Sequence, residues 1–431
     1  MRYRLAELER PLMGELRGPD AVATGACVDT RALAEGDLFF ALRGVRDGVD
    51  FVPEAFSRGA SGAVVPVYFK GTERPIIIVE DTLTALVRLA FFHRNRIDSR
   101  VIAITGSSGK TCVKDMIALL LGTKFSVSAS PQSFNNHIGV PLSILASNCE
   151  DFLVLEIGTN HPGEIRPLGG LARPHFAVIT SIGRSHLEAF GNTHGVAREK
   201  SELLSCLERN GIAFLPERLL HEDIILSAVR PDVRVIRYQA EDIEVNGSGA
   251  SFTFRGEKFR VPVPHPGYAQ NAACAIAVAL EMGIEPDAAR KALLSFVPTG
   301  MRMKTERIGE IDVINDAYNS NPDTAEAFVL SLSQPERTIL VLGDMLELGP
   351  DSPRFHRELG EIAAKRNFKK IICVGDLSRN TADSSGGIWF PGPDEAAKYL
   401  SQTLKPGDKL ALKASRLMRL ERILEVLRDV L

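Results

Sequence analysis

The amino-acid sequence predicts an α/β protein with more than one domain. Short apolar runs rich in β-branched residues alternate along the chain with stretches whose apolar residues have helical spacing, which is typical of parallel sheets covered by helices. The chain has 431 residues, more than one hydrophobic core usually organises. Its 45% hydrophobic and 24% charged residues are the composition of a compact globular protein. We therefore expect domains over residues 1–97, 98–298 and 299–431.

The first two predicted domains differ in their pattern. Residues 1–97 contain short apolar runs at 38–42, 63–67 and 76–79, separated by glycine-rich turns, and this pattern predicts a small α/β domain. The second domain begins with a predicted strand at 101–105 and continues with strands at 152–156 and 177–182. Helical patterns separate these strands, so we expect a mostly parallel, doubly wound sheet.

The third predicted domain follows a change of rhythm. A polar, β-like stretch at 233–263 precedes an alanine-rich helix at 271–281, and the Pro- and Gly-containing residues 298–300 mark a domain boundary. Beyond it, strands at 338–342, 370–374 and 409–412 alternate with helices. This alternation predicts a Rossmann-like unit.

Composition excludes several classes of protein. The formal net charge is −3 and the pI is near 6.3, without the basic excess of a nucleic-acid-binding protein. No apolar run is long enough for a membrane span, and the first residues carry charges where a signal peptide needs an apolar core. We therefore expect a cytoplasmic protein. Six scattered cysteines without a CxxC pair predict buried free thiols.

The most informative segment is residues 100–125, RVIAITGSSGKTCVKDMIALLLGTKF, in which a glycine-containing loop joins a strand to a helix. Backbone N–H groups and the helix dipole attract phosphate at such a loop. Lys110 can neutralise the β- and γ-phosphates, and the Thr111 hydroxyl can ligate Mg²⁺, as in a Walker A loop. Ile104 stands where the general pattern has its first glycine, and only the backbone N–H of Cys112 is needed, so its thiol is not expected to matter. The predicted phosphate-binding residues are Gly106, Ser107, Ser108, Gly109, Lys110, Thr111 and Cys112. The alternative is an ordinary strand-to-helix turn.

Three residues near the carboxyl ends of predicted strands are candidate metal ligands. Glu156 ends FLVLE, His186 follows FAVITSIGRS, and Lys200 lies in the next predicted helix. Taken singly, Glu156 could be a surface charge and His186 a structural residue. Lys200 shares a helical stripe with apolar residues, so it either extends its charge to the surface or is buried with a lowered pKa. A neutral buried amine could react with CO₂ to form a carbamate, an anionic oxygen ligand.

Three polar segments are candidate substrate contacts. Residues 133–136 (SFNN), 159–163 (TNHPG) and 315–322 (NDAYNSNP) are rich in amides, which can hydrogen-bond a peptide or a phosphate. Such residues also form turns. The third segment directly follows a predicted strand at 311–314, which favours a functional role.

Taken together, these motifs resemble the Mur ligase family in the same order and over the whole chain. The motifs are TGSSGKT, SFNNHIGVPLSIL, LEIGTNHPGEI, ITSIGRSHLEAFG with AREKSEL, NDAYNSNPD and LVLGDMLELG. The distinctive ones match the members that join D-Ala-D-Ala to a UDP-N-acetylmuramoyl-tripeptide (UDP-MurNAc-tripeptide). The N-terminal VDTRALAEGDLFFALRGVRDGVDFVPEA is similar to their UDP-binding domain. The resemblance therefore implies a small UDP-binding domain, a central P-loop ATPase domain and a C-terminal Rossmann-like domain that binds the dipeptide.

The resemblance also implies cofactors and site residues. ATP would lie on the P-loop, Thr111 and Glu156 would hold one Mg²⁺, and a second Mg²⁺ would lie between Glu156, His186 and carbamylated Lys200. Asn271 and Asp316 would contact adenosine, and Arg302 the phosphates. The implied substrate contacts are Asn135 and Asn136 at the reacting groups, Thr30, Arg31, Asp47 and Gly48 at the UDP sugar, Asn160 and His161 at its peptide, and Tyr318, Asn319, Asn321, Lys413 and Ser415 at the dipeptide.

The implied reaction is an ATP-dependent, ADP-forming ligation. The tripeptide carboxylate would take the γ-phosphoryl group to form an acyl phosphate, which the dipeptide amine would attack. Lys110, Lys200, His186 and Arg302 would be the catalytic residues, in a monomer that closes its domains and needs neither nucleic acid nor a membrane. The chain departs from the family at Gly267 and Tyr268, where a His-Asn pair is usual, and at His137, in a slot that is usually acidic or polar.

Three alternatives remain. The ligase for the third peptide residue is closely similar, but it often carries a DNPR motif, which is absent here. Folylpolyglutamate synthase shares the ATP-binding elements and lacks the UDP-type N-terminal domain. A nucleotide-binding switch or scaffold would need only the P-loop and Mg²⁺, and it would not need Glu156, His186 and Lys200 together.

Overall fold

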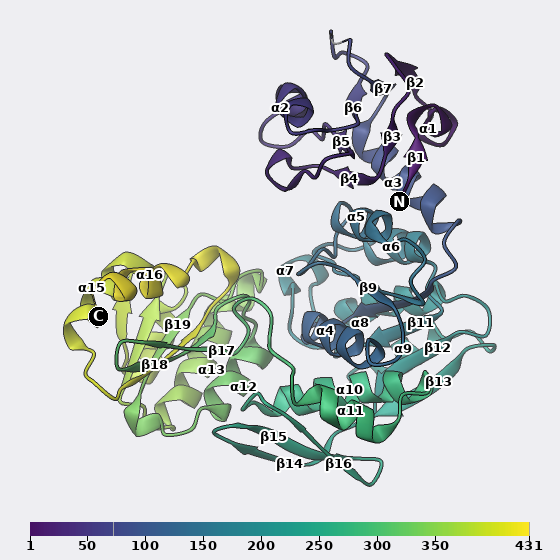
Figure 1. Cartoon of the computed structure of the whole chain (residues 1–431). Helices are drawn as coiled ribbons and strands as arrows, with labels where there is room; N and C mark the ends of the chain where they lie inside the picture. Colours follow the sequence, from purple (N-terminus) through teal and green to yellow (C-terminus); the bar gives the residue numbers. More distant parts are fainter. Residues whose placement is uncertain (72, 431) are drawn as a thin grey trace.

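The structure, a computed structural model, describes residues 1–71 and 73–430. Figure 1 shows three lobes in chain order, each with its own sheet and helices. The N-terminal lobe packs through α3 (Thr82–Arg94) on α5 (Gly139–Ala146) and α6 (Ile165–Ala172) of the central lobe. The C-terminal lobe lies on another side of the central lobe. The predicted α/β class with parallel sheets is confirmed, while the boundaries after residues 97 and 298 stay predictions.

The N-terminal lobe contains a five-stranded sheet in the order β2-β7-β6-β5-β4. Its strands are β2 (Glu15–Arg17), β4 (Gly25–Cys27), β5 (Asp37–Phe40), β6 (Gly62–Pro66) and β7 (Ile76–Val79). All neighbours are parallel except β2, which is antiparallel to β7. The lobe is completed by the antiparallel pair β1 (Tyr3–Arg4) and β3 (Val22–Ala23) and by the helices α1 (Leu5–Leu12) and α2 (Val52–Ser57).

The central lobe contains a six-stranded, fully parallel sheet in the order β13-β12-β11-β8-β10-β9. Its strands are β8 (Arg100–Thr105), β9 (Val127–Ala129), β10 (Phe152–Glu156), β11 (Phe176–Ile179), β12 (Ile212–Pro216) and β13 (Arg234–Tyr238). The remaining helices of the lobe are α4 (Lys110–Leu121), α7 (Leu187–Phe190), α8 (Thr193–Ser205), α9 (Glu222–Ser227), α10 (Pro266–Glu281) and α11 (Pro286–Leu293). A separate antiparallel sheet is formed by β14 (Glu241–Asn246), β15 (Gly249–Phe254) and β16 (Glu257–Val261).

The C-terminal lobe contains a second six-stranded sheet, in the order β17-β18-β22-β19-β20-β21. Its strands are β17 (Lys304–Ile308), β18 (Ile311–Asp316), β19 (Thr338–Gly343), β20 (Lys370–Val374), β21 (Ile388–Phe390) and β22 (Lys409–Lys413). Only the β17/β18 pair is antiparallel. The helices are α12 (Pro322–Ser331), α13 (Ser352–Ala364), α14 (Arg379–Ser385), α15 (Pro393–Thr403) and α16 (Glu421–Val430).

The centre of the central sheet positions the P-loop. β8 lies between β10 and β11, and Ile104 of β8 pairs with both Glu156 and Val178. Residues 101–104 are fully buried, because helices cover both faces of a parallel sheet. The P-loop and Glu156 therefore lie at the same edge, at the carboxyl ends of adjacent strands.

Several predicted elements have different limits in the structure. β11 ends at Ile179 instead of residue 182, because the following residues leave the ladder to pack behind the P-loop. β18 continues through Asp316, whereas the sequence predicted polar residues after a strand ending at 314. Helix α10 begins at Pro266 instead of residue 271, because Pro suits a first helical turn and His265 caps it.

The described residues also answer two compositional predictions. Their six cysteines are all free; four are buried, while Cys149 is exposed and Cys206 is intermediate. None of their helices combines the length and the apolar character that a membrane span requires.

Candidate active site

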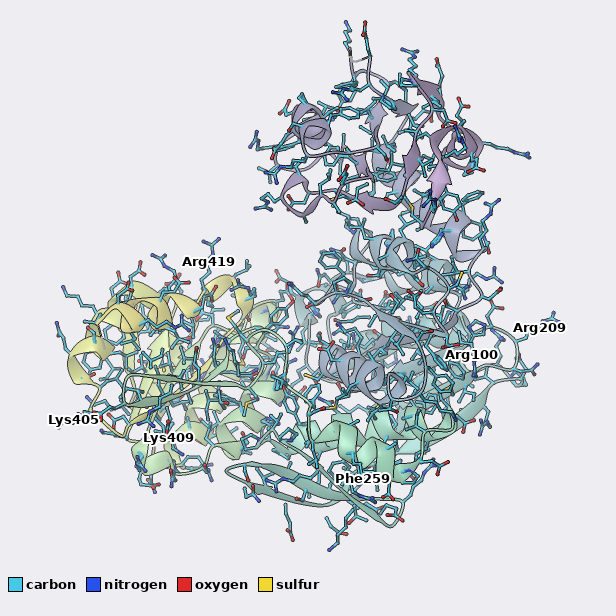
Figure 2. The ribbon with its side chains drawn as sticks, in the orientation of Figure 1. Arg100, Arg209, Phe259, Lys405, Lys409 and Arg419 are labelled. Carbon is cyan, nitrogen blue, oxygen red and sulfur yellow. The ribbon has the colours of Figure 1, made fainter. Side chains whose placement is uncertain are left out.

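A cavity of about 790 Å³ lies between the central and C-terminal lobes, at the carboxyl ends of β8 and β10. In Figure 2 the labelled side chains of Arg209, Lys405 and Arg419 lie on the outer surfaces of these lobes, away from their boundary. The predicted site residues on the cavity wall are Ser107, Ser108, Gly109, Lys110, Thr111, Cys112, Asn135, Asn136, Glu156, Asn160, His161, His186, Asn271, Arg302, Asp316, Tyr318, Asn319, Asn321 and Lys413. Segments from most of the chain after residue 100 thus meet in one place.

The P-loop has the backbone that phosphate binding requires. Gly106 has φ 152° and Gly109 has φ 82°, in the region that side chains disfavour. A Cβ at Gly106 would collide with Thr180, and one at Gly109 would lie 2.5 Å from Asn271 Oδ1. Helix α4 begins at Lys110 without a side-chain cap, which leaves its first N–H groups available to an anion. The Lys110 ammonium donates to the Gly106 carbonyl at 2.8 Å, and burial lowers its pKa.

Thr111, Glu156 and Asn135 form a buried polar cluster beside the P-loop. The Thr111 hydroxyl donates to Glu156 Oε2 at 2.7 Å, and the Asn135 amide donates to Oε1 at 2.7 Å. A hydroxyl next to a carboxylate is a donor set that suits Mg²⁺ bound together with phosphate oxygens. No group of three or more His, Cys, Asp or Glu residues with metal-binding geometry occurs in residues 1–71 and 73–430. A metal at this cluster would therefore depend on the Thr111 hydroxyl and on oxygens of a bound phosphate, in addition to the Glu156 carboxylate.

His186 lies on the cavity wall at the start of α7, in the left-handed conformation with φ 52°. Its Nδ1 lies 2.5 Å from Glu347 Oε2 of the C-terminal lobe, and the contact with His186 lowers the pKa of Glu347. The Glu347 carbonyl also accepts from Glu188 N at 3.0 Å. The motif LGDMLELG therefore contacts the central lobe beside His186. Glu347 was not predicted as a site residue, because nothing in the sequence places it near His186.

Lys200 is buried on α8, with 1% of its surface exposed. This excludes the alternative in which its charge extends to the surface. No hydrogen bond or ion pair reaches its ammonium group within the described part of the chain. Burial, with a further contribution from the Lys110 charge, holds the pKa of Lys200 well below its usual value, although Glu199 opposes the shift. The amine is thus neutral at lower pH than an ordinary lysine, and Lys200 is not among the residues that line the cavity.

Glu199, the neighbour of Lys200, positions one of the predicted substrate loops. Its carboxylate accepts from Gly163 N at 2.7 Å and from Ile165 N at 2.8 Å. The same loop carries Asn160 and His161, and the site prediction did not include Glu199. Its place inside the AREKSEL motif was the available signal.

Arg302 reaches from the linker between the lobes to the P-loop. Its guanidinium donates to Thr111 Oγ1 and to Ser133 Oγ, both at 3.1 Å, and lies 3.6 Å from the centre of the Tyr318 ring. The Ser133 and Tyr318 hydroxyls also share a close hydrogen bond. The side chain therefore contacts the central and C-terminal lobes at once, with its charge beside Thr111 at the start of α4.

The predicted dipeptide residues are only partly on the cavity wall. Lys413 lies there, but its ammonium group pairs with Asp316 Oδ2 at 2.6 Å and donates to Asn319 O at 2.8 Å. Its charge therefore holds the NDAYNSNP loop. Ser415, which was predicted at the dipeptide, is not among the residues that line the cavity; it is buried beneath this loop, where it accepts from Leu346 N at 3.0 Å. Its hydroxyl is used to join two loops.

The residues predicted at the UDP sugar lie apart from this cavity, in the N-terminal lobe. Thr30 is buried in a short 3₁₀ turn, and Arg31 is exposed and paired with Asp29. Asp47 accepts from the Tyr68 hydroxyl at 2.7 Å, and Gly48 is packed against the backbone of residues 41 and 42. They lie in a different lobe from the P-loop.

Arg184 joins the central and C-terminal lobes and was also not predicted. Its backbone N–H donates to Asp323 Oδ2 at 2.6 Å and its Nε to Oδ1 at 2.7 Å. Its other nitrogens lie 3.5 Å from Glu326 and 3.8 Å from Glu358. These carboxylates belong to α12 and α13, far from Arg184 in the sequence, so no local pattern could indicate the contact.

Comparison with known proteins agrees with this architecture. Residues 104–279 match the Mur ligase middle domain, and residues 301–416 match the Mur ligase, glutamate ligase domain. The chain is 34% identical to the UDP-N-acetylmuramoyl-tripeptide–D-alanyl-D-alanine ligase of Bacillus subtilis (strain 168), over 98% of this chain and 96% of that protein. The chain therefore belongs to the Mur ligase family, and the predicted resemblance is confirmed.

Solved structures of related ligases are similar over nearly the whole chain. MurF from Acinetobacter baumannii superposes with a TM-score of 0.90 and 28% identity, covering 100% of this chain and 99% of that one. MurF ligase from Thermotoga maritima, solved in complex with ADP, superposes with a TM-score of 0.81 and 28% identity, covering 94% and 97%. The arrangement of all three lobes is thus one that these ligases share.

Proposed function

We propose that this protein is an ATP-dependent, ADP-forming ligase that joins D-Ala-D-Ala to UDP-MurNAc-tripeptide, producing the pentapeptide precursor of peptidoglycan. The observation that carries the proposal is the contact of Arg302 with Thr111, whose hydroxyl also donates to Glu156, at a cavity between two lobes. The relatives named for this reaction, and the ADP bound to one of them, support it. Its soluble substrates would be met in the cytoplasm, and a single copy contains all the proposed residues.

The proposed reaction begins with charge neutralisation at the P-loop. The N–H groups of α4 bind the phosphates, and the Lys110 ammonium turns from the Gly106 carbonyl to them. Arg302 offsets the charge that otherwise repels the tripeptide carboxylate from the γ-phosphate. Asn271 and Asp316 bind the adenosine, and Thr111 and Glu156 would hold Mg²⁺, which would supply further charge neutralisation when bound.

The ligation then proceeds in two bond exchanges. An oxygen of the tripeptide carboxylate bonds to the γ-phosphorus as the bond to the ADP oxygen breaks, which gives an acyl phosphate. The dipeptide amine then attacks the acyl carbon, and phosphate leaves with the former carboxylate oxygen while the nitrogen loses a proton. Asn135 and Asn136 orient the reacting groups, while Tyr318, Asn319 and Asn321 contact the dipeptide.

We also propose that Lys200 carries a carbamate, which together with Glu156 and His186 would hold a second Mg²⁺. A neutral amine attacks CO₂, forming an N–C bond and releasing one proton, and the resulting anion would be stabilised by the nearby Lys110 charge. The burial of Lys200, its lack of a partner in the described residues and its lowered pKa support this modification.

Measuring ADP release with a panel of UDP-linked peptides and acceptors tests the proposed function. ADP should form only when UDP-MurNAc-tripeptide and D-Ala-D-Ala are both present, because the acyl phosphate needs both partners to turn over. Turnover with UDP-MurNAc-dipeptide and a diamino acid would instead identify the ligase for the third residue. Steady ATP hydrolysis without any peptide would count against ligation.

Replacing Lys200 tests the carbamate. Lys200→Ala should lower kcat by at least about a hundredfold, as loss of a metal-binding group does. Short-chain carboxylates such as acetate should restore part of the activity, because they can occupy the space of the missing carbamate. Mass spectrometry of native protein under ¹³CO₂ checks the modification directly. Full activity of Lys200→Ala would remove the carbamate from the mechanism.

A further inference from the structure

Tyr268 lies in the first turn of α10, where the sequence departs from the family pattern. His265 Nδ1 accepts from Gly267 N at 3.0 Å and caps the helix, so Tyr268 is not needed as a cap. Its ring is buried between His265, 6.0 Å away, and Phe296, 6.3 Å away between ring centres. The ring therefore has a defined position on the cavity wall.

The Tyr268 hydroxyl makes two contacts that fix its direction. It donates to the Arg302 carbonyl at 3.1 Å, and the Cys112 thiol, 3.5 Å away, donates to it. Burial raises the pKa of Cys112 to about 11 and that of Tyr268 well above its usual value, so both groups keep their protons. The Cys112 thiol, which was not expected to matter, thus supports the Tyr268 hydroxyl that contacts the linker.

The backbone around Arg302 is hydrogen-bonded to both lobes. Its neighbours belong to the C-terminal lobe, because Met301 O accepts from Tyr318 N at 3.1 Å and Met303 N donates to Asp316 Oδ1 at 2.9 Å. The carbonyl of Arg302 itself is held by Tyr268 of the central lobe. This bond lies at the backbone from which the guanidinium extends to Thr111.

We propose that Tyr268 is a positioning residue that sets the direction of Arg302 toward the phosphates. The inference rests on the proposed function, in which Arg302 neutralises charge during phosphoryl transfer. Without the hydroxyl, the Arg302 peptide loses its bond to the central lobe and follows the C-terminal lobe alone. The guanidinium then spends less time against Thr111, although ATP still binds through the P-loop.

Comparing Tyr268→Phe with Tyr238→Phe tests the proposal. Both hydroxyls are buried in the central lobe and donate to a backbone carbonyl, that of Tyr238 to Ile179 O at 2.8 Å. Tyr268→Phe should lower kcat about tenfold with the KM for ATP changed less than about twofold, as expected for one lost bond that acts in the transition state. Tyr238→Phe should reduce thermal stability similarly and leave kcat unchanged. Equal effects of the two variants on kcat would overturn the inference.

A double-mutant cycle and a spectroscopic measurement separate positioning from packing. In an Arg302→Ala background, Tyr268→Phe should have less than about twofold further effect on kcat, because its route of action is gone. The Nε–H NMR signal of Arg302, assigned with Arg302→Lys, should shift or broaden in Tyr268→Phe and not in Tyr238→Phe. An unchanged signal would overturn the inference whatever the substrates are, whereas wild-type protein that forms no ligation product would overturn only the proposed function.

Discussion

For three ionisable residues in and around the cavity, burial changes the pKa more than neighbouring charges do. Lys110, Lys200 and His265 all have lowered pKa values with burial as the largest cause. The sequence could indicate Lys110 because the P-loop is contiguous, and it left the burial of Lys200 open because periodicity does not give depth. Tyr268 could not be predicted as a positioning residue, since its partner Arg302 lies in another segment and the contact depends on where α10 begins.

His265 gives a prediction for the pH dependence of stability. Burial, with a smaller contribution from Lys413, lowers its pKa from 6.5 to about 4, although Asp316 opposes the shift. Between these values the unfolded chain binds a proton that the folded protein excludes, so the free energy of unfolding falls as pH decreases. His265→Asn keeps a capping acceptor and removes the titrating group. Between about pH 7 and about pH 4.5, the free energy of unfolding of this variant should therefore fall by about 2 kcal/mol less than that of the wild type.

Urea unfolding of both proteins across this range measures the difference. His93, His175 and His356 also have lowered pKa values, but they are present in both proteins and cancel in the comparison. Parallel stability curves for wild type and His265→Asn would show that the site takes up its proton without cost.

At the scale of elements, the positions of several strands could be predicted from the sequence, but where their polar, site-facing ends stop could not. β7, β10 and β20 have the predicted limits, because β-branched runs between turn residues leave little choice. β18 runs through Asp316 because its polar end pairs with β17 and β22, contacts that its own residues do not reveal. The conformation of the loop before α6 likewise depends on a distant contact, with Glu199 of α8, and could not be predicted from the residues of the loop itself.

Replacing Glu199 tests this support between elements. Glu199→Gln keeps one acceptor and turns an amide group toward a backbone N–H, so one of its two bonds to residues 163 and 165 is lost, at about 1–3 kcal/mol. The KM for the UDP-linked peptide should rise about fivefold with the KM for ATP unchanged, as measured by ADP release. Glu202→Gln, on the same helix and paired with Arg166 of α6, is the control and should leave both values unchanged. A rise in the KM for ATP alone would contradict the assignment of this loop to the peptide.

At the scale of the whole molecule, the cavity exists only while the central and C-terminal lobes are docked. Arg184 is the main ionic contact between them, and it is continuous with the P-loop because Gly183 N donates to Ser107 Oγ at 2.9 Å. One short segment, Gly183 and Arg184, thus both supports the P-loop and binds the C-terminal lobe. The sequence predicted the lobes and their order, but their mutual position depends on carboxylates from α12 and α13.

Removing Arg184 should loosen this docking without unfolding either lobe. Its ion pairs are partly exposed, so each contributes at most about 1 kcal/mol, but Arg184→Ala removes all of them together and leaves Asp323, Glu326 and Glu358 to repel one another. The KM for D-Ala-D-Ala should rise about five- to tenfold, and small-angle scattering should show a larger radius of gyration. Added salt should expand the wild-type protein toward the variant, because it screens the same charges.

Arg422→Ala, which removes an exposed pair with Asp394 inside the C-terminal lobe, is the control and should change neither the KM nor the radius of gyration. If Arg184→Ala and Arg422→Ala scatter alike at low salt, docking depends on the apolar and hydrogen-bonded contacts around Arg302 and Glu347 instead.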